Sequence, residues 1–80
     1  MKIVYHPDFK KAFKKFPISI KNKLEKQAFY LATNIRHPSL HAKKYDETSD
    51  IWQARVDKGV RFYFLIKKDI YVLIDIRYHN

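Results

Sequence analysis

The chain has 80 residues, 46% hydrophobic and 16% aromatic, so it is apolar enough to fold and too short for more than one domain. We therefore expect a single domain over residues 1–80. It has no cysteine, which excludes disulfides and thiolate metal sites and suits the reducing cytosol. No apolar run approaches the roughly 20 residues of a membrane span, and His6-Pro7-Asp8 interrupts the N-terminal segment before a secretion signal forms. These features predict a cytoplasmic protein that does not enter membranes.

Charge is the strongest feature of the composition. The 17 Lys and Arg residues against 8 Asp and Glu residues give a formal net charge of +9. Residues 1–44 hold 11 basic and 2 acidic side chains, whereas residues 45–80 hold 6 of each. A basic domain of this kind attracts polyanions, and nucleic acid is the commonest of them. The alternative explanation is that the lysines only keep the helices in solution.

The first half of the chain carries one short strand and two helical patterns. Residues 1–5 are rich in strand-forming side chains. Apolar residues then recur at i, i+3, i+4 and i+7 through residues 8–16, with lysines on the opposite face. Pro17 ends this helix and opens a second one, which continues through residues 17–35. Because the break is so short, the two helices are expected to form an antiparallel hairpin.

The period changes from 3.6 to 2 in the second half. After a loop over residues 36–50, apolar and polar side chains alternate along residues 51–57, 60–66 and 70–78. The pattern predicts a three-stranded meander. Together with the first strand, the sequence predicts an α+β fold with an antiparallel β-sheet in the order β-α-α-β-β-β and the helical hairpin packed on one face.

Strict alternation assigns each strand residue to a face. It places Ile70, Val72 and Ile74 under the helices, with Tyr71 and Leu73 on the open face. The open face also receives polar and charged side chains from all three strands: Gln53, Arg55, Asp57, Arg61, Tyr63, Asp75, Arg77 and His79. The last strand therefore ends by placing basic groups on an uncovered surface.

Such a face suits the cleavage of RNA without a metal. That reaction needs a base for the ribose 2′-hydroxyl, cations for the charge on the phosphate oxygens and an acid for the departing 5′-oxygen. Arginine grips two phosphate oxygens at once, and histidine exchanges protons near neutral pH. Arg55, Arg61 and His79 thus form a candidate ribonuclease site. The spacing of His37 and His41 is seen in zinc sites, but further ligands are lacking, so no metal and no cofactor are expected.

Short motifs add a family resemblance. The order of elements, with "HPSLHAKKY" after the second helix, "WQARV" and "VRFYF" on successive strands and the ending "IRYHN", resembles the RelE/ParE superfamily of toxins from bacterial toxin–antitoxin pairs. The resemblance covers essentially the whole chain. It implies a small cytosolic ribonuclease that enters the ribosomal A site and cuts the messenger RNA there. It also implies a cognate antitoxin, which the net charge of +9 predicts to be acidic.

The resemblance gives roles to individual residues. Arg61 stands where these nucleases keep a phosphate-binding arginine, and Arg55 where RelE-type members carry a basic catalytic residue. His79 corresponds to the general acid of the YoeB-like branch, and Lys44 lies in a loop that supplies catalytic or RNA-contacting groups. Three further residues are expected to contact RNA: Lys43, Arg77 and Asn80.

The chain also departs from the family pattern. Asn80 follows the terminal histidine where YoeB-like toxins have a tyrosine, and Gln53 stands where RelE-like toxins have a lysine. The general base stays open among Asp46, Glu47 and Asp75, none of which aligns with the base of the YoeB-like branch.

Two other functions remain as alternatives. One is inhibition of DNA gyrase, as in the ParE-like branch, which needs no catalytic residues. The other is a binding module that docks on ribosomal RNA or DNA without chemistry. For Arg55 the structural alternative is an ion pair with Asp57 or Asp75 across the sheet.

Overall fold

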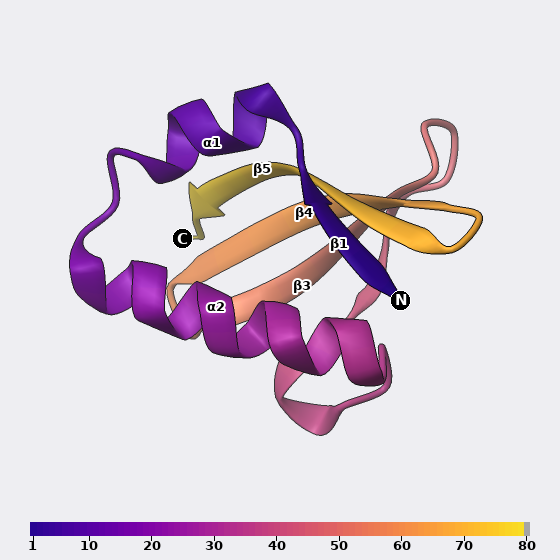
Figure 1. Ribbon diagram of the computed structural model, residues 1–80, viewed down its shortest axis with the longest axis horizontal. Helices are drawn as coiled ribbons and strands as arrows, with labels where there is room; N and C mark the ends of the chain where they lie inside the picture. Colours follow the sequence, from indigo (N-terminus) through magenta and orange to yellow (C-terminus); the bar gives the residue numbers. More distant parts are fainter. Residues whose placement is uncertain (80) are drawn as a thin grey trace.

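The structure is a five-stranded sheet with two helices packed on one face (Figure 1). It is a computed structural model that describes residues 1–79. The elements in chain order are β1 Lys2–Tyr5, α1 Pro7–Phe13, α2 Ile18–Thr33, the short 3₁₀ helix η1 Pro38–Leu40, β2 Lys43–Asp46, β3 Ile51–Asp57, β4 Val60–Lys67 and β5 Ile70–Tyr78. The predicted α+β class and the predicted order of strands and helices are confirmed, with one additional strand.

The additional strand, β2, lies in the segment expected to be a loop. It pairs antiparallel with β3 and forms one edge of the sheet, whose strand order is β1-β5-β4-β3-β2. The other edge strand, β1, pairs parallel with β5, so the sheet is mixed rather than wholly antiparallel. A parallel pair needs a long connection, and in the chain both helices, η1 and the strands β2, β3 and β4 come between β1 and β5.

The helices differ from their expected bounds by a few residues. α1 begins at Pro7, because His6 rather than Asp8 is its N-cap: the Nδ1 atom of His6 accepts a hydrogen bond of 3.0 Å from the backbone N–H of Asp8. Pro17 precedes α2, as expected of a residue that fixes its own φ and has no N–H to donate. None of the helices in residues 1–79 is long and apolar enough to cross a membrane.

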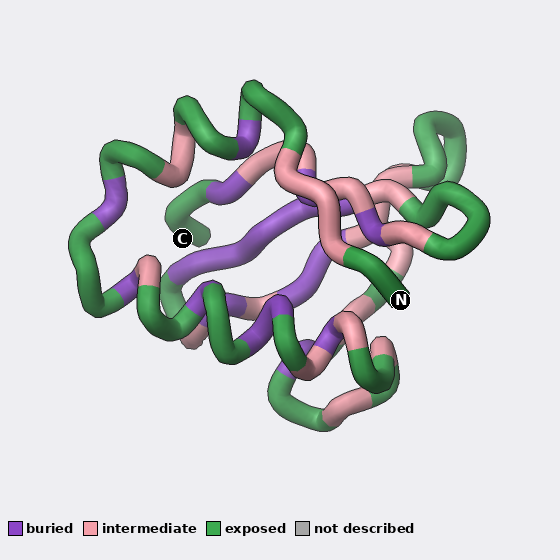
Figure 2. Tube along the Cα trace, in the orientation of Figure 1, coloured by how far each residue is buried: buried purple, intermediate pink, exposed green. Residues whose placement is uncertain are grey.

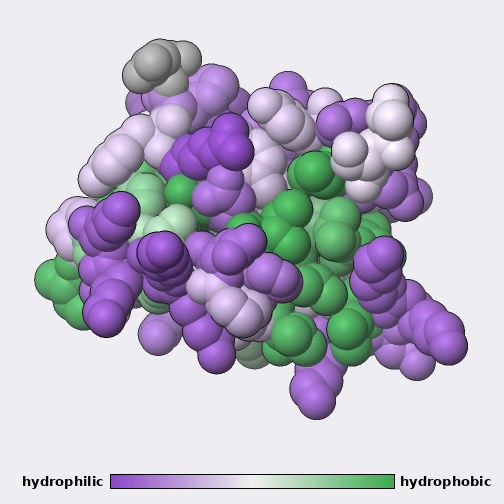
Figure 3. Space-filling view, turned by 90° about the horizontal axis from the view of Figure 1, so that it is seen from above, coloured by the Kyte–Doolittle hydropathy of each residue, from purple (hydrophilic) through white to green (hydrophobic). Residues whose placement is uncertain are grey.

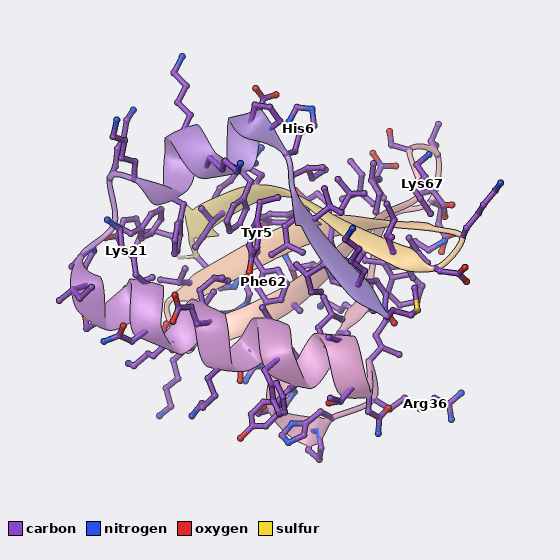
Figure 4. The ribbon with its side chains drawn as sticks, in the orientation of Figure 1. Tyr5, His6, Lys21, Arg36, Phe62 and Lys67 are labelled. Carbon is purple, nitrogen blue, oxygen red and sulfur yellow. The ribbon has the colours of Figure 1, made fainter. Side chains whose placement is uncertain are left out.

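The core lies between the helices and one face of the sheet. Phe9 of α1, Leu24 and Leu31 of α2 and Phe62 and Phe64 of β4 are almost completely buried. Figure 2 shows β4 buried along much of its length, and Figure 4 shows Phe62 at the centre of the molecule, with Lys21 and Arg36 at its periphery. Burial of five large apolar side chains, at about 1.5–3 kcal/mol each, is a main source of stability in a domain of this size.

A β-bulge in β5 overturns part of the predicted face assignment. Tyr63 pairs with Asp75 and Phe64 pairs with Leu73, so Ile74 has no partner and the alternation shifts by one residue. Tyr71 and Leu73 are consequently in the core, with 6% and 0% exposure, whereas Ile70, Val72 and Ile74 are only partly buried. The prediction from strict alternation was wrong for this end of β5, because a bulge leaves no mark in the hydrophobic pattern.

The bulge divides the open face of the sheet into two halves. The "arginine half" comprises two cross-strand rows of polar side chains: Lys43, Gln53, Tyr63 and Asp75, then Arg55, Arg61 and Arg77. The "apolar half" comprises Val4, Ile51, Leu65, Ile70, Val72 and Ile74. Viewed from above, the apolar half is a continuous hydrophobic area with hydrophilic side chains around it (Figure 3).

Candidate functional site

A cavity of about 390 Å³ opens on the arginine half of the sheet. It is lined by His41, Ala42, Lys43, Gln53, Arg55, Arg61 and His79. These residues come from β2, β3, β4, the segment after η1 and the end of β5. The structure thus brings Arg55, Arg61 and His79 together, and their catalytic roles remain predictions.

Arg61 is the most firmly held cation of the cavity. Its side chain is nearly buried, with 8% of the residue exposed, and its Nη1 atom donates hydrogen bonds to the backbone oxygens of Asp57, Lys58 and Val60 at 2.8, 3.1 and 3.3 Å. No carboxylate of residues 1–79 lies within ion-pair distance of it. A buried arginine without a carboxylate is costly unless an anion joins it. The remaining N–H groups of the Arg61 guanidinium are therefore suited to bind a phosphate.

Three arginines stand side by side on neighbouring strands. Arg55 is directly opposite Arg61 on β3, and Arg77 is directly opposite Arg61 on β5. Like charges in cross-strand register destabilise a sheet. Arg55 does not form the alternative ion pair. A register shift in β3 puts Asp57 opposite the buried Val60, where it pairs with Lys23 of α2 at 3.1 Å, so its predicted place on the open face was wrong. Asp75 pairs with Arg77 at 2.6 Å. A bound anion would relieve this repulsion.

Arg77 lies beside the cavity rather than in its lining. Its hydrogen bond to Asp75 raises the pKa of the Arg77 guanidinium, and the guanidinium sits 5.4 Å from the centre of the Tyr63 ring. The side chain is exposed and carries its charge to the rim. Arg77 is thus placed for contact with a long ligand. Asn80, the other terminal residue expected to contact RNA, lies outside the described residues.

His79 is fixed through its backbone. Its N–H donates a hydrogen bond of 2.8 Å to the oxygen of Gly59 in the β3–β4 turn. This bond continues the pairing of β5 beyond Tyr78 and holds the imidazole at the cavity, although the residue is exposed.

The two loop lysines point to different faces. Lys43 is in register with Gln53 and lines the cavity, whereas Lys44 is in register with Trp52. Lys44 pairs with Asp50 and lies 5.4 Å from the centre of the Trp52 ring. The hydrogen bond to Asp50 raises the pKa of Lys44, which holds the proton more firmly. The structure therefore does not bring Lys44 to the other predicted catalytic residues.

The three carboxylates considered as bases are engaged elsewhere. Asp46 accepts hydrogen bonds from the backbone N–H groups of Thr48 and Ser49, and Glu47 lies 3.8 Å from Lys44. Asp75 accepts from Arg77 and from the backbone of Ile76. None of the three is among the residues that line the cavity.

Two residues of the site were missed by the sequence analysis. His41 lines the cavity and was considered only for zinc binding. Gln27 of α2 is 3% exposed, and its Nε2 atom donates to the backbone oxygens of Ser39 at 3.1 Å and Arg55 at 2.9 Å. It therefore ties η1, which precedes His41, to β3, which carries Arg55. The sequence did offer a sign of the role of Gln27, because this polar residue stands among the apolar residues on the buried side of α2.

Within residues 1–79 no group of three or more histidine, aspartate or glutamate side chains is arranged to hold a metal ion.

The chain is similar to known proteins in structure but not detectably in sequence. No protein-family model and no curated protein matches its sequence. Among solved structures, a YoeB/ParE toxin from Agrobacterium tumefaciens is 13% identical and superposes with a TM-score of 0.79 over 100% of both chains. A metal-bound toxin from Helicobacter pylori is 19% identical, with a TM-score of 0.77 over 99% of this chain and 94% of that one.

A third similar structure is the RelB–RelE antitoxin–toxin complex from Methanococcus jannaschii, 14% identical, with a TM-score of 0.76 over 94% of this chain and 88% of that one. The chain has the fold of the RelE/ParE toxins. The resemblance seen in short motifs is thus confirmed at the level of the fold, and at these identities the likeness extends no further.

Proposed function

We propose that this protein is the toxin of a toxin–antitoxin pair and a metal-independent endoribonuclease that cuts messenger RNA on the ribosome. The observation that carries the proposal is the cavity around Arg61. A nearly buried arginine that pairs with no carboxylate of residues 1–79 stands next to Arg55, Lys43 and His79, so the cavity offers a concentrated positive charge to a phosphate. The shared fold of the RelE/ParE toxins supports the same reading.

In the proposed mechanism the arginines bind the scissile phosphate. Arg61 is held by backbone carbonyls through one nitrogen, which leaves the other side of its fork for two phosphate oxygens. Arg55 and Lys43 add charge at the same cavity. Because these cations are already in place, they stabilise the charge that builds up on the oxygens in the transition state without reorganisation.

His79 is the proposed general acid. A protonated imidazole gives its proton to the departing 5′-oxygen as the phosphorus–oxygen bond breaks. Lys44 has no step in this mechanism, because it lies on the Trp52 side of the sheet. Arg77 is proposed to bind the RNA strand next to the cavity.

The proposed partner is an acidic antitoxin that covers the open face. The apolar half is partly exposed and is not covered by any element of the described chain. A segment with apolar side chains against Leu65 and Val72, and with carboxylates reaching Arg55 and Arg61, would match both halves. The antitoxin–toxin complex from M. jannaschii supports the proposal of an antitoxin partner.

The proposed activity is tested by adding the purified protein to a translating ribosome system and mapping the ends of the messenger RNA. We expect cuts at regular codon positions, lost in Arg61→Ala and His79→Ala variants that keep the melting temperature of the parent. Absence of cutting by the parent protein would contradict the proposal. An assay of DNA gyrase supercoiling on the same preparation then separates a gyrase inhibitor from a binding module without chemistry.

A further inference from the structure

The four histidines of the chain fall into two pairs. His6 and His37 are structural: the Nδ1 atom of each accepts a backbone hydrogen bond at the start of a helix, and the His37 ring also stacks on Tyr30 at 3.8 Å. His41 and His79 make no side-chain hydrogen bond to any described residue, and both line the same cavity. Two imidazoles are thus available where the phosphate would bind.

The position of His41 is set by its neighbours. Its backbone is in the left-handed region, with φ of 46°, immediately after η1. Leu40 before it is fully buried, and Ala42 after it packs against the core. Gln27 holds η1 against the strand of Arg55. A left-handed backbone is unfavourable for a residue with a side chain, and such strain collects at functional sites.

Other candidates for the base are weaker. Among residues 1–79 the lining of the cavity contains no carboxylate, and Asp46, Glu47 and Asp75 are bound to other groups. Lys43 is in the lining, but an ammonium group gives up its proton less readily near neutral pH than an imidazole does. His41 is the one remaining proton acceptor among the described residues of the lining that suits this task.

We propose that His41 is the general base of the cleavage and works opposite His79 as the acid. This inference rests on the proposed ribonuclease function. The neutral imidazole of His41 takes the proton of the ribose 2′-hydroxyl, and the 2′-oxygen attacks phosphorus. The bond from phosphorus to the 5′-oxygen breaks, and His79 gives its proton to that oxygen. The products are a 2′,3′-cyclic phosphate and a free 5′-hydroxyl, with no other reactant.

The test separates the base from the acid by changing the leaving atom. Messenger RNA with sulfur in place of the 5′-bridging oxygen at the cut site leaves as a thiolate, which needs no acid. On ordinary messenger, His41→Asn and His79→Ala should each cut about 10²- to 10⁴-fold more slowly than the parent. On the sulfur substrate His79→Ala should approach the parent rate, whereas His41→Asn should stay slow. Asparagine tolerates a left-handed backbone, so His41→Asn should keep the parent melting temperature.

Results that contradict the role of His41 can be told apart from results that contradict the ribonuclease function itself. His41→Asn that cuts ordinary messenger at the parent rate, or that recovers on the sulfur substrate as His79→Ala does, would overturn the assignment of the base. A His41→Gly variant that also accepts the backbone gives a second measurement: added imidazole should restore its cutting, and no recovery would count against His41. A parent protein that cuts neither substrate would instead refute the proposed function.

Discussion

The two halves of the open face lie on the same strands and have opposite chemistry. In the arginine half, like charges stand opposite one another on β3, β4 and β5. In the apolar half, Val4, Leu65 and Val72 lie side by side on β1, β4 and β5. The arginine half places like charges next to each other, which destabilises a sheet, and the apolar half leaves hydrophobic side chains partly exposed to solvent. Such departures from folding rules are expected where a ligand or a partner completes the surface.

The largest effect should come from the anchored arginine. Arg61→Gln removes the cation at the centre of the cavity, and loss of one such donor typically lowers a rate about 10²- to 10³-fold. Arg61→Lys should also cut more slowly, because a single ammonium group cannot bind the backbone carbonyls and two phosphate oxygens at the same time. Single-turnover cleavage on the ribosome measures both.

The matched control for Arg61 is Arg77→Gln, on the rim of the same row. Arg77 is exposed and lies outside the lining, so its loss should slow cutting by less than about tenfold, a difference of about 1.4 kcal/mol. Equal losses for the two variants would mean that the cavity is not the centre of the activity.

The boundary between the halves can be tested by stability. The bulge places Leu73 in the core and Val72 on the open face, opposite to strict alternation. Leu73→Ala should therefore lower the free energy of unfolding by about 2–5 kcal/mol, and Val72→Ala by less than about 1 kcal/mol. Denaturant unfolding curves give both values. A larger loss for Val72→Ala would put the bulge elsewhere.

A smaller effect is expected from the link between η1 and β3. Gln27→Leu leaves the backbone oxygens of Ser39 and Arg55 without their buried donor, which should lower the free energy of unfolding by about 1–3 kcal/mol. Cutting should fall as well, because His41 loses its support. Asn22→Leu, an exposed position on the same helix, is the control and should change neither quantity.

The smallest predicted effect concerns the apolar half. Val72→Asp places a carboxylate where the acidic antitoxin is proposed to pack, so the affinity should fall by about tenfold, or about 1.4 kcal/mol, while cutting stays at the parent rate. Titration calorimetry and the cleavage assay measure the two. If Val72→Asp lost cutting and kept the parent affinity for the antitoxin, the apolar half would serve cleavage rather than antitoxin binding.

The sequence predicted the parts of this molecule that depend on local pattern. The helix stripes, the three strands of the meander and the polar face of the sheet that carries Arg55 and Arg61 follow from the spacing of apolar and polar residues. Arg55, Arg61 and His79 could be placed on one face because β3 as far as Arg55, β4 and the last part of β5 alternate regularly. The family resemblance predicted the fold where sequence comparisons find no match.

The parts that could not be predicted depend on register. Ile74 is as apolar as the paired residues around it, so the sequence does not show that it is the unpaired residue of a bulge. Strict alternation therefore assigned Tyr71 and Leu73 to the open face, whereas the structure places them in the core. Lys43 and Lys44 lie in a segment without an alternating pattern, and only pairing with β3 shows which one reaches the cavity. His41 gave no signal either, because its left-handed backbone and the tie through Gln27 are tertiary features.

The central claim is that the cavity around Arg61 cuts RNA through the ribose 2′-oxygen. It is tested most directly with a messenger that carries a single 2′-deoxynucleotide at the mapped cut, presented on the ribosome to the parent protein. We predict that cutting at this position disappears while cutting at unmodified positions of the same messenger continues. Unchanged cutting at the deoxynucleotide would show that the 2′-oxygen is not the nucleophile and would contradict the mechanism.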